Sequence, residues 1–282
     1  MLIDFLRFFV IVSCMKLVRF DEFGYIRPGV VLDGGILLDV SERVGDYDRN
    51  FFSSGGICEL RDWVDAGCAD AVVVDREVHL VPPISMQGAS LYMVGAGLDL
   101  DVISMCDVSG RVDCLGEGDS LVYGEMERVE FESVSVACVL GEGVTMGGNA
   151  GICDLLVGCV VMSSFRVISP NGVSRCCGFG SKLVTADELG RHPLTGDFSR
   201  CWSRRNKHHA LVAWFVEMGL CMRTVLERVL ESQDAGVGDV IAISNSLCNS
   251  GRGIDSLPLG CGDLLECGVD GLGVTRHRVV AA

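Results

Sequence analysis

The sequence predicts an α+β protein that is mostly β. Short apolar runs rich in β-branched residues recur along the chain, and most of them are bounded by glycine. One long segment, 210–232, instead repeats its apolar residues with the period of a helix. The pair Pro82-Pro83 marks a boundary, because proline restricts the residue before it and ends regular structure. Many strands around few helices are typical of an α+β or mostly-β architecture.

Residues 1–14, MLIDFLRFFVIVSC, form an apolar N-terminal extension. The run is shorter than the roughly 20 residues that cross a bilayer, and it lacks the basic start and cleavage site of a signal peptide. We interpret it as an upstream extension before the first strand. Targeting to an organelle is the alternative.

Residues 15–82 are predicted to form a small N-terminal β-rich domain. Asp33-Gly34-Gly35 separates two apolar runs and indicates a tight hairpin. A short helix is expected near Cys58–Ala66. The expected strands are Lys16–Phe20, Gly29–Leu32, Ile36–Val40, Ala71–Asp75 and Val78–Val81.

Residues 83–282 are predicted to form the larger domain. In the 210–232 helix, one apolar face would carry Leu211, Phe215, Met218, Met222, Leu226 and Val229. The expected strands are Leu91–Gly95, Ser133–Leu140, Leu155–Met162, Asp239–Ser244, Asp263–Gly268 and Val274–Ala281.

Charge and cysteine content restrict the function classes. The formal net charge of −15 argues against nucleic acid or an anionic membrane surface as a partner. The basic run Arg204–His209 is interpreted as a solvated turn before the helix. The 15 cysteines include no Cys-x-x-Cys pair, so they do not indicate a zinc module, and they favour reduced thiols inside a cell. We therefore expect a cytoplasmic protein, with an organellar matrix as the alternative.

Both ends of the chain resemble the fumarylacetoacetate hydrolase superfamily, especially its short bacterial-type members. At the front, MKLVRF and RPGVVLDGGILLDVS are similar to its small N-terminal β domain. At the back, VGDVIAIS and CGDLLECGVDGLGVTRHRVVAA are similar to the turns and strands that close its β-roll, and SKLVTADELG is similar to a segment after its active-site loop. The resemblance implies a β-roll domain over 83–282.

The resemblance also implies a chemistry. Such enzymes hold magnesium or manganese with carboxylates and use the metal to grip a 2-oxo acid or β-diketone, while other side chains move protons. Family members carry Glu-x-Glu before a Val-Ile-Gly run, and Val139-Leu140-Gly141 places Ser133 and Ser135 at those positions. Ser164 takes the position of the third ligand, an Asp.

The proton-transfer positions are substituted as well. The resemblance places Asp101 where the family has a catalytic His, Ser104 where it has a Glu, and Asn171 near its loop lysine. In an alternative register, Glu130 and Glu132 would supply the Glu-x-Glu pair, which requires a bulge before Leu140. His277, between Arg276 and Arg278 in the last strand, is expected to be a surface or interface group.

Two classes of function follow. The first is a catalytically degenerate member without a cofactor, acting as a structural or regulatory subunit. It would form a homo-oligomer or a hetero-oligomer with an active paralogue. The second is a magnesium- or manganese-dependent C–C bond hydrolase, lyase or decarboxylase with relocated ligands.

Overall fold

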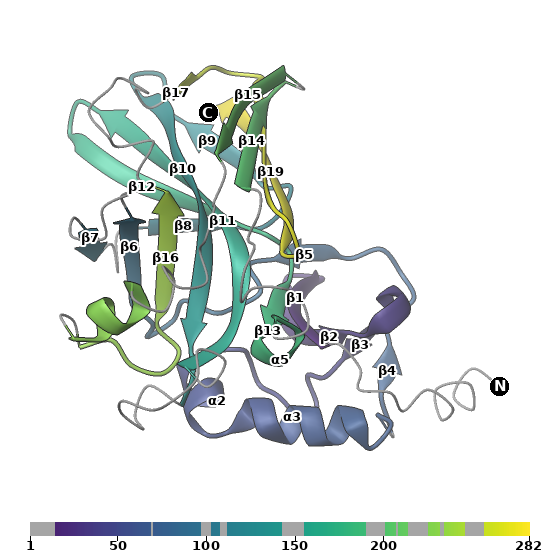
Figure 1. The fold of residues 1–282 in the computed structure, drawn as a ribbon. Helices are drawn as coiled ribbons and strands as arrows, with labels where there is room; N and C mark the ends of the chain where they lie inside the picture. Colours follow the sequence, from purple (N-terminus) through teal and green to yellow (C-terminus); the bar gives the residue numbers. More distant parts are fainter. Residues whose placement is uncertain are drawn as a thin grey trace.

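The computed structural model describes residues 15–68, 70–96, 103–107, 112–142, 155–189, 201–206, 208–213, 225–231, 234–245 and 257–282. Two sheets dominate this part of the chain (Figure 1). The larger has 14 strands and the smaller has 5. The predicted α+β, mostly β fold class is confirmed.

The N-terminal strands form a meander. Asp33–Gly35 turns the chain between β2 and β3, and Gly34 and Gly35 both have positive φ, which glycine adopts without strain. The predicted hairpin and the predicted helix near 58–66 are confirmed. The elements are β1 (Lys16–Glu22), β2 (Tyr25–Val31), η1 (Asp33–Gly35), β3 (Leu37–Asp39), α2 (Arg49–Ser53), α3 (Gly56–Asp65), β4 (Val72–Val73) and β5 (His79–Val81).

Later strands complete the larger sheet, whose path runs β4-β3-β2-β1-β13-β11-β10-β16-β6-β7, with β5, β8, β12 and β17 joined at its sides. Its elements are β6 (Leu91–Ala96), β7 (Ile103–Asp107), β8 (Val112–Leu115), β10 (Arg128–Leu140), β11 (Leu156–Ser169), β12 (Gly172–Phe179), β13 (Leu183–Thr185), α5 (Ala186–Leu189), β16 (Val240–Asn245) and β17 (Leu257–Leu259).

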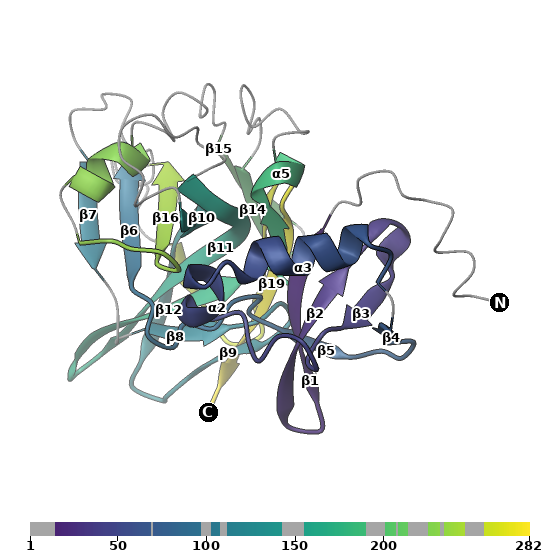
Figure 2. The ribbon, with the colours of Figure 1, turned by 90° about the horizontal axis from the view of Figure 1, so that it is seen from below.

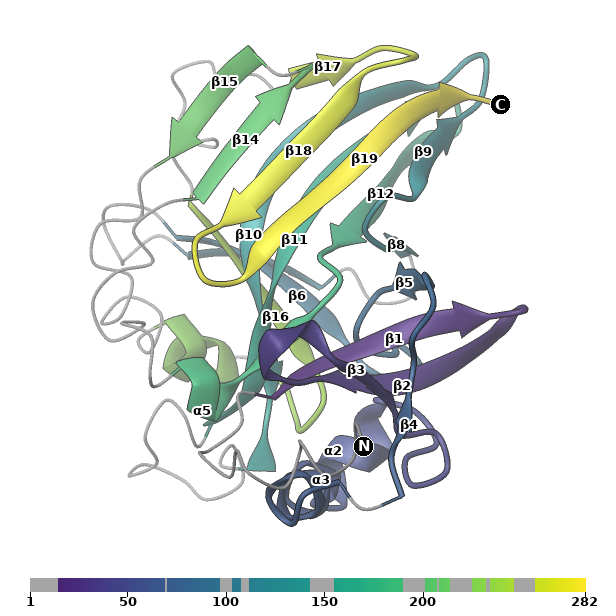
Figure 3. The same ribbon diagram turned by 90° about the vertical axis from the view of Figure 1, so that its right-hand side faces the viewer.

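The smaller sheet packs beside the long strands of the larger one. Its order is β15-β14-β18-β19-β9, and Figure 3 shows β18 and β19 lying across β10 and β11. The elements are β9 (Ser120–Tyr123), β14 (Cys201–Arg205), β15 (His208–Ala213), β18 (Leu264–Val269) and β19 (Gly273–Ala281).

The β10–β11 pair is the centre of the molecule, and both of its faces are buried. Alternate residues belong to different cores: Val136 and Cys138 face one cluster, while Ala137 and Val139 face another that includes α3. Figure 2 shows α2 and α3 covering this second side. A third cluster lies between β10–β12 and the smaller sheet.

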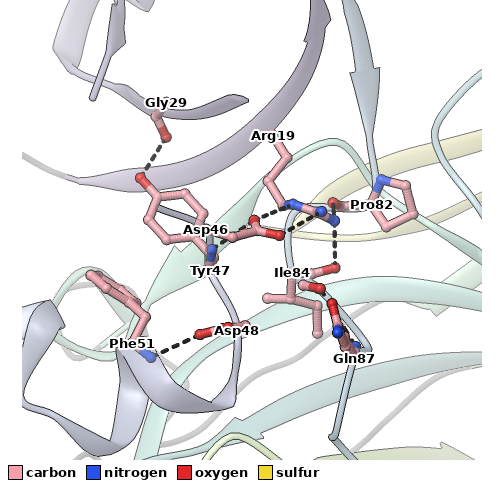
Figure 4. Close-up of polar contacts among 10 residues, drawn as sticks. Arg19, Gly29, Asp46, Tyr47, Asp48, Phe51, Pro82, Ile84 and Gln87 are labelled. Atoms are coloured by element: carbon pink, nitrogen blue, oxygen red, sulfur yellow. Dashed lines mark hydrogen bonds and ion pairs between the residues drawn. The ribbon is translucent and has the colours of Figure 1, made fainter. Parts of the chain in front are cut away.

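Polar contacts of Arg19 hold the chain at Pro82, the predicted boundary between the two domains. The Arg19 guanidinium donates to the carbonyl oxygens of Pro82 and Ile84, at 3.3 and 3.1 Å, and pairs with Asp46 at 2.7 Å (Figure 4). Beside it, the buried Tyr47 hydroxyl donates to the Gly29 carbonyl oxygen at 2.9 Å. The predicted 15–82 and 83–282 division stays a prediction, and β1 pairs directly with β13 across it.

The predicted 210–232 helix is wrong at its start. Residues 208–213 form β15, which pairs with β14 through a turn at Asn206. The basic run 204–209 therefore spans the end of β14, this turn and the start of β15, and does not lie before a helix. Residues 225–231 are helical, and residues 214–224 lie outside the described ranges. The apolar run 210–213 is too short for its pattern to distinguish a strand from a helix, and pairing with β14 makes it a strand.

Gly158 permits the contact between β11 and β13. A Cβ atom there would lie 2.2 Å from the carbonyl oxygen of Val184 and 3.0 Å from the Cα of Thr185, both backbone atoms. We expect Gly158→Ala to lower the free energy of unfolding by at least about 2 kcal/mol, measured by urea denaturation. Gly45→Ala is the matched control, because a Cβ at Gly45 meets nothing within 4 Å. Equal stability of the two variants would contradict the packing described.

Candidate functional site

The serine positions at 133, 135 and 164 lie side by side. Ser133 on β10 is the register partner of Ser164 on β11, and their Oγ atoms are 2.8 Å apart. The Oγ atoms of Ser133 and Ser135 are 3.5 Å apart. All three side chains are buried, with exposed fractions of 7% or less. Ser133 therefore lies between the other two hydroxyls and contacts both.

A β-bulge separates this serine cluster from the outer part of β10. The register with β11 shifts between Phe131 and Ser133, which leaves Glu132 without a register partner. A second shift lies between Val139 and Leu140. The chain thus contains bulges before Leu140 of the kind that the alternative register requires.

Arginines bind both glutamates. Glu130 is 2.6 Å from Arg166 and 3.0 Å from Arg128, and its side chain is 9% exposed. Glu132 is 3.2 Å from Arg175 and 3.5 Å from Arg166. We call the alternating set of Glu130, Arg166, Glu132 and Arg175 the charge ladder. Its carboxylates already have cationic partners from the protein.

The residues present do not fit a hard divalent cation. Magnesium and manganese need carboxylate oxygens, whereas the serine cluster is neutral and its Ser133 and Ser164 hydroxyls bond to each other. In the described part of the chain, no group of three or more His, Cys, Asp or Glu side chains is placed to hold a metal ion. Because a cation would have to displace arginines from the charge ladder, that ladder is no better a site.

The structure does not bring Asn171, the proton-transfer position that it describes fully, to the serine cluster. Asn171 is exposed at the turn between β11 and β12, where its N–H donates to Ser169 Oγ at 3.3 Å. Ser169 is five residues beyond Ser164 on one strand, so the turn lies about 17 Å away. Ser104 belongs to β7, opposite Gly95, and its side chain lies outside the described atoms. Asp101 lies outside the described residues.

Sequence reasoning missed two cysteines that continue the serine row. Cys177 on β12 is the register partner of Ser164, and Cys114 on β8 is the partner of Cys177. Burial raises the pKa of the Cys177 thiol well above its ordinary value, and burial together with Asp113 raises the pKa of Cys114 to about 11. Both are therefore protonated at neutral pH and are weak nucleophiles. The sequence gives no indication that Cys114 and Cys177 are neighbours, because β8 and β12 are far apart in sequence.

The expectation of a surface His277 is wrong. Thr275, His277 and Val279 all point inward from β19, and His277 is 1% exposed. Burial lowers its pKa, so the ring is neutral at physiological pH. One ring nitrogen contacts the Thr275 hydroxyl and the other lies 3.2 Å from the carbonyl oxygen of Asp119. Because alternate residues of a strand share a face, the buried Thr275 and Val279 place the His277 side chain on the buried face of β19.

Similarity to known proteins is confined to solved structures. No family model and no curated protein matches the sequence. Maleylpyruvate hydrolase from Sphingobium sp. SYK-6 is 17% identical, with a TM-score of 0.68, over 95% of this chain and 100% of that one. Fumarylacetoacetate hydrolase from Exiguobacterium antarcticum is 18% identical, with a TM-score of 0.65, over 95% and 100%.

A third similar structure contains a metal. It is 2-keto-3-deoxy-D-arabinonate dehydratase in complex with magnesium and 2,5-dioxopentanoate, 16% identical, with a TM-score of 0.61, over 95% of this chain and 99% of that one. The Sphingobium enzyme has also been solved with manganese(II) and pyruvate. At these identities the likeness shows a shared fold.

Removing one carboxylate tests whether Glu130 balances the positive charge of its arginine partners. Replacing Glu130 by Gln keeps its shape but removes the charge that faces Arg166 and Arg128. We expect Glu130→Gln to reduce the free energy of unfolding by about 1–3 kcal/mol, measured by urea denaturation. The exposed Glu125→Gln is the control and should change little. An increase in stability would instead indicate an uncompensated carboxylate, as expected of an empty cation site.

Proposed function

We propose that this chain, which has the fold of the fumarylacetoacetate hydrolase superfamily, is a catalytically degenerate member that acts as a structural or regulatory subunit. The observation that carries the proposal is the direct hydrogen bond between Ser133 and Ser164, two positions where the family resemblance expects carboxylate ligands. A pair of hydroxyls bonded to each other supplies neither the negative charge nor the open coordination that a catalytic cation needs.

The charge ladder supports the same reading. In a metal-dependent enzyme, convergent carboxylates remain available to the ion, whereas Glu130 and Glu132 face three arginines. Asn171, at the position of the family's lysine, lies at the far end of the β11–β12 hairpin. Asn171 therefore lies too far from the serine cluster to take part in proton transfer there.

A role as a subunit requires a partner. The mean hydropathy is +0.39, and several large apolar side chains are solvent-exposed in the single chain. The most exposed are Phe23, Tyr25, Met126, Val173 and Val122. Association would cover such surface, so we propose a homo-oligomer, or a hetero-oligomer with an active paralogue.

The compartment follows from the same proposal. Cys68, Cys176, Cys177 and Cys267 are buried as thiols, as expected of a reducing environment. We propose the cytoplasm, with an organellar matrix as the alternative. None of the helices in the described part of the chain combines the length and apolar character needed to span a bilayer.

A second candidate function rests on the bulge at Glu132. This bulge allows Glu130 and Glu132 to be considered as relocated ligands of magnesium or manganese in a C–C bond hydrolase, lyase or decarboxylase acting on a 2-oxo acid or β-diketone. It would require a cation to replace Arg166 and Arg175 at both carboxylates. The two candidates differ in whether the unmodified protein binds a hard cation.

We expect calorimetric titration with manganese or magnesium to give no saturable binding at sub-millimolar metal, because the serine cluster is uncharged. Acylpyruvates and oxaloacetate should not be turned over. Tight manganese binding that Glu130→Gln or Glu132→Gln abolishes would refute the non-catalytic proposal and establish the relocated site.

The matched variant for this titration restores the family's ligand chemistry. Ser133→Glu, Ser135→Glu and Ser164→Asp together should produce measurable manganese binding without activity, since Asp101 and Asn171 remain unsuited to proton transfer. Circular dichroism should first show that the triple variant keeps its β structure. A folded triple variant that binds no manganese would contradict the assignment of these positions.

Association is tested separately. Light scattering at micromolar concentration should give a mass of at least twice the 30.2 kDa of one chain. The physical reason is the exposed apolar surface described above. A monomer at every concentration would refute the homo-oligomer and leave the paralogue complex, which co-expression with that paralogue would then have to reveal.

A further inference from the structure

Four neighbouring strands bring a row of small hydroxyl and thiol side chains together. The row runs Ser133 (β10), Ser164 (β11), Cys177 (β12) and Cys114 (β8), each residue being the register partner of the next. Cys177 and Cys114 pack into the same hydrophobic cluster, whereas the adjacent Cys176 packs into a different one. The two thiols at the end of the row therefore share one face of the sheet.

The spacing of the two strands at Cys114 and Cys177 suits a bridging ion. Neighbouring strands lie about 4.8 Å apart, and directly paired side chains on one face keep about that separation. With a metal–sulfur distance of about 2.3 Å, the value for zinc thiolates, an ion held in line by two thiolates would have sulfurs about 4.6 Å apart. Little movement of either backbone would be needed to close such a bridge.

The ligand chemistry selects a soft cation of low coordination number. Structural zinc requires four ligands, and the described residues contain no cluster of three or more His, Cys, Asp or Glu placed for a metal. Thiolate and thioether ligands favour Cu(I). Met162 supplies a thioether nearby. It lies on the same face of β11, two residues before Ser164, and is diagonal to Cys177.

We propose that Cys114 and Cys177 form a two-thiolate site for a soft monovalent cation of the Cu(I) type, with the Met162 thioether as a neighbouring ligand. This site goes beyond the proposed subunit function and does not rest on it. Binding releases two thiol protons to solvent and leaves the metal and both thiolates with one net negative charge.

Access favours this pair over the other cysteines. Arg175 lies two residues before Cys177 and is paired with Glu132 at 3.2 Å, so the charge ladder borders the pair. Cys114 is only partly buried, which gives an ion a route to the pair. Cys138 and Cys159 have Sγ atoms 3.5 Å apart, but both are fully buried.

The test is an anaerobic Cu(I) titration of the full chain in the presence of a chromophoric Cu(I) chelator as competitor. One equivalent should be withheld from the chelator, with a thiolate-to-metal absorption in the ultraviolet. Cys177→Ala and Cys114→Ala should each weaken the retained binding at least 100-fold. Ag(I), which undergoes no redox chemistry here, should show the same pattern.

Cys176→Ala is the matched control, since it removes a buried thiol from the same strand but from the opposite face. It should leave the withheld equivalent unchanged. Thermal melting monitors folding, and Cys114→Ala, at a less buried position, keeps the test decisive if Cys177→Ala unfolds. Unchanged binding in folded Cys114→Ala, or equal loss in Cys176→Ala, would overturn the site. Failure here leaves the manganese result, and hence the proposed function, unaffected.

Discussion

The antiparallel pair β10–β11, buried on both faces, is the constraint on which the rest of the structure depends. Because side chains alternate along a strand, burial on both sides assigns successive residues in the central part of these strands to opposite interiors. Sliding either strand by one residue would exchange those interiors. The N-terminal strands connect to this pair through β13, and Gly158 lets β13 lie close to β11. The position of β1 and its neighbours therefore depends on the same two strands.

The same constraint explains why the polar groups of the candidate site are paired with one another. A buried hydroxyl or carboxylate costs free energy unless it has a partner. Ser133 therefore bonds to Ser164, and Glu130 binds Arg166, each across a single rung of the β10–β11 ladder. The bulge at Glu132 lies between these rungs and allows a second carboxylate to reach Arg175. Charged groups thus pair with charged groups, and hydroxyls with hydroxyls, in neighbouring parts of the two strands.

Much of the fold could be predicted from sequence where the signal was local. The hairpin at Asp33–Gly35 and the helix over Gly56–Asp65 depend on nearby residues, and both are observed. Strand β12 was not predicted, because Ser174-Arg175-Cys176-Cys177 has no β-branched run, and pairing with β11 determines its structure. For the candidate site, the anchor at Val139-Leu140-Gly141 gave the serine positions. Their contacts, and the arginines facing Glu130, depend on register across strands, which sequence alone does not contain.

The way in which β11 and β12 continue past the serines couples the serine cluster to the charge ladder. Their ladder extends from Ser164–Cys177 to Ser169–Gly172, and it fixes Arg166 beside Arg175. Two adjacent guanidiniums require the carboxylates of Glu130 and Glu132 for charge balance. A single carboxylate introduced at Ser133 would meet the Ser164 hydroxyl in a buried position without a cation of its own, at a cost in stability. The serine cluster and the charge ladder therefore depend on one another, and changing one residue of either disturbs its partners.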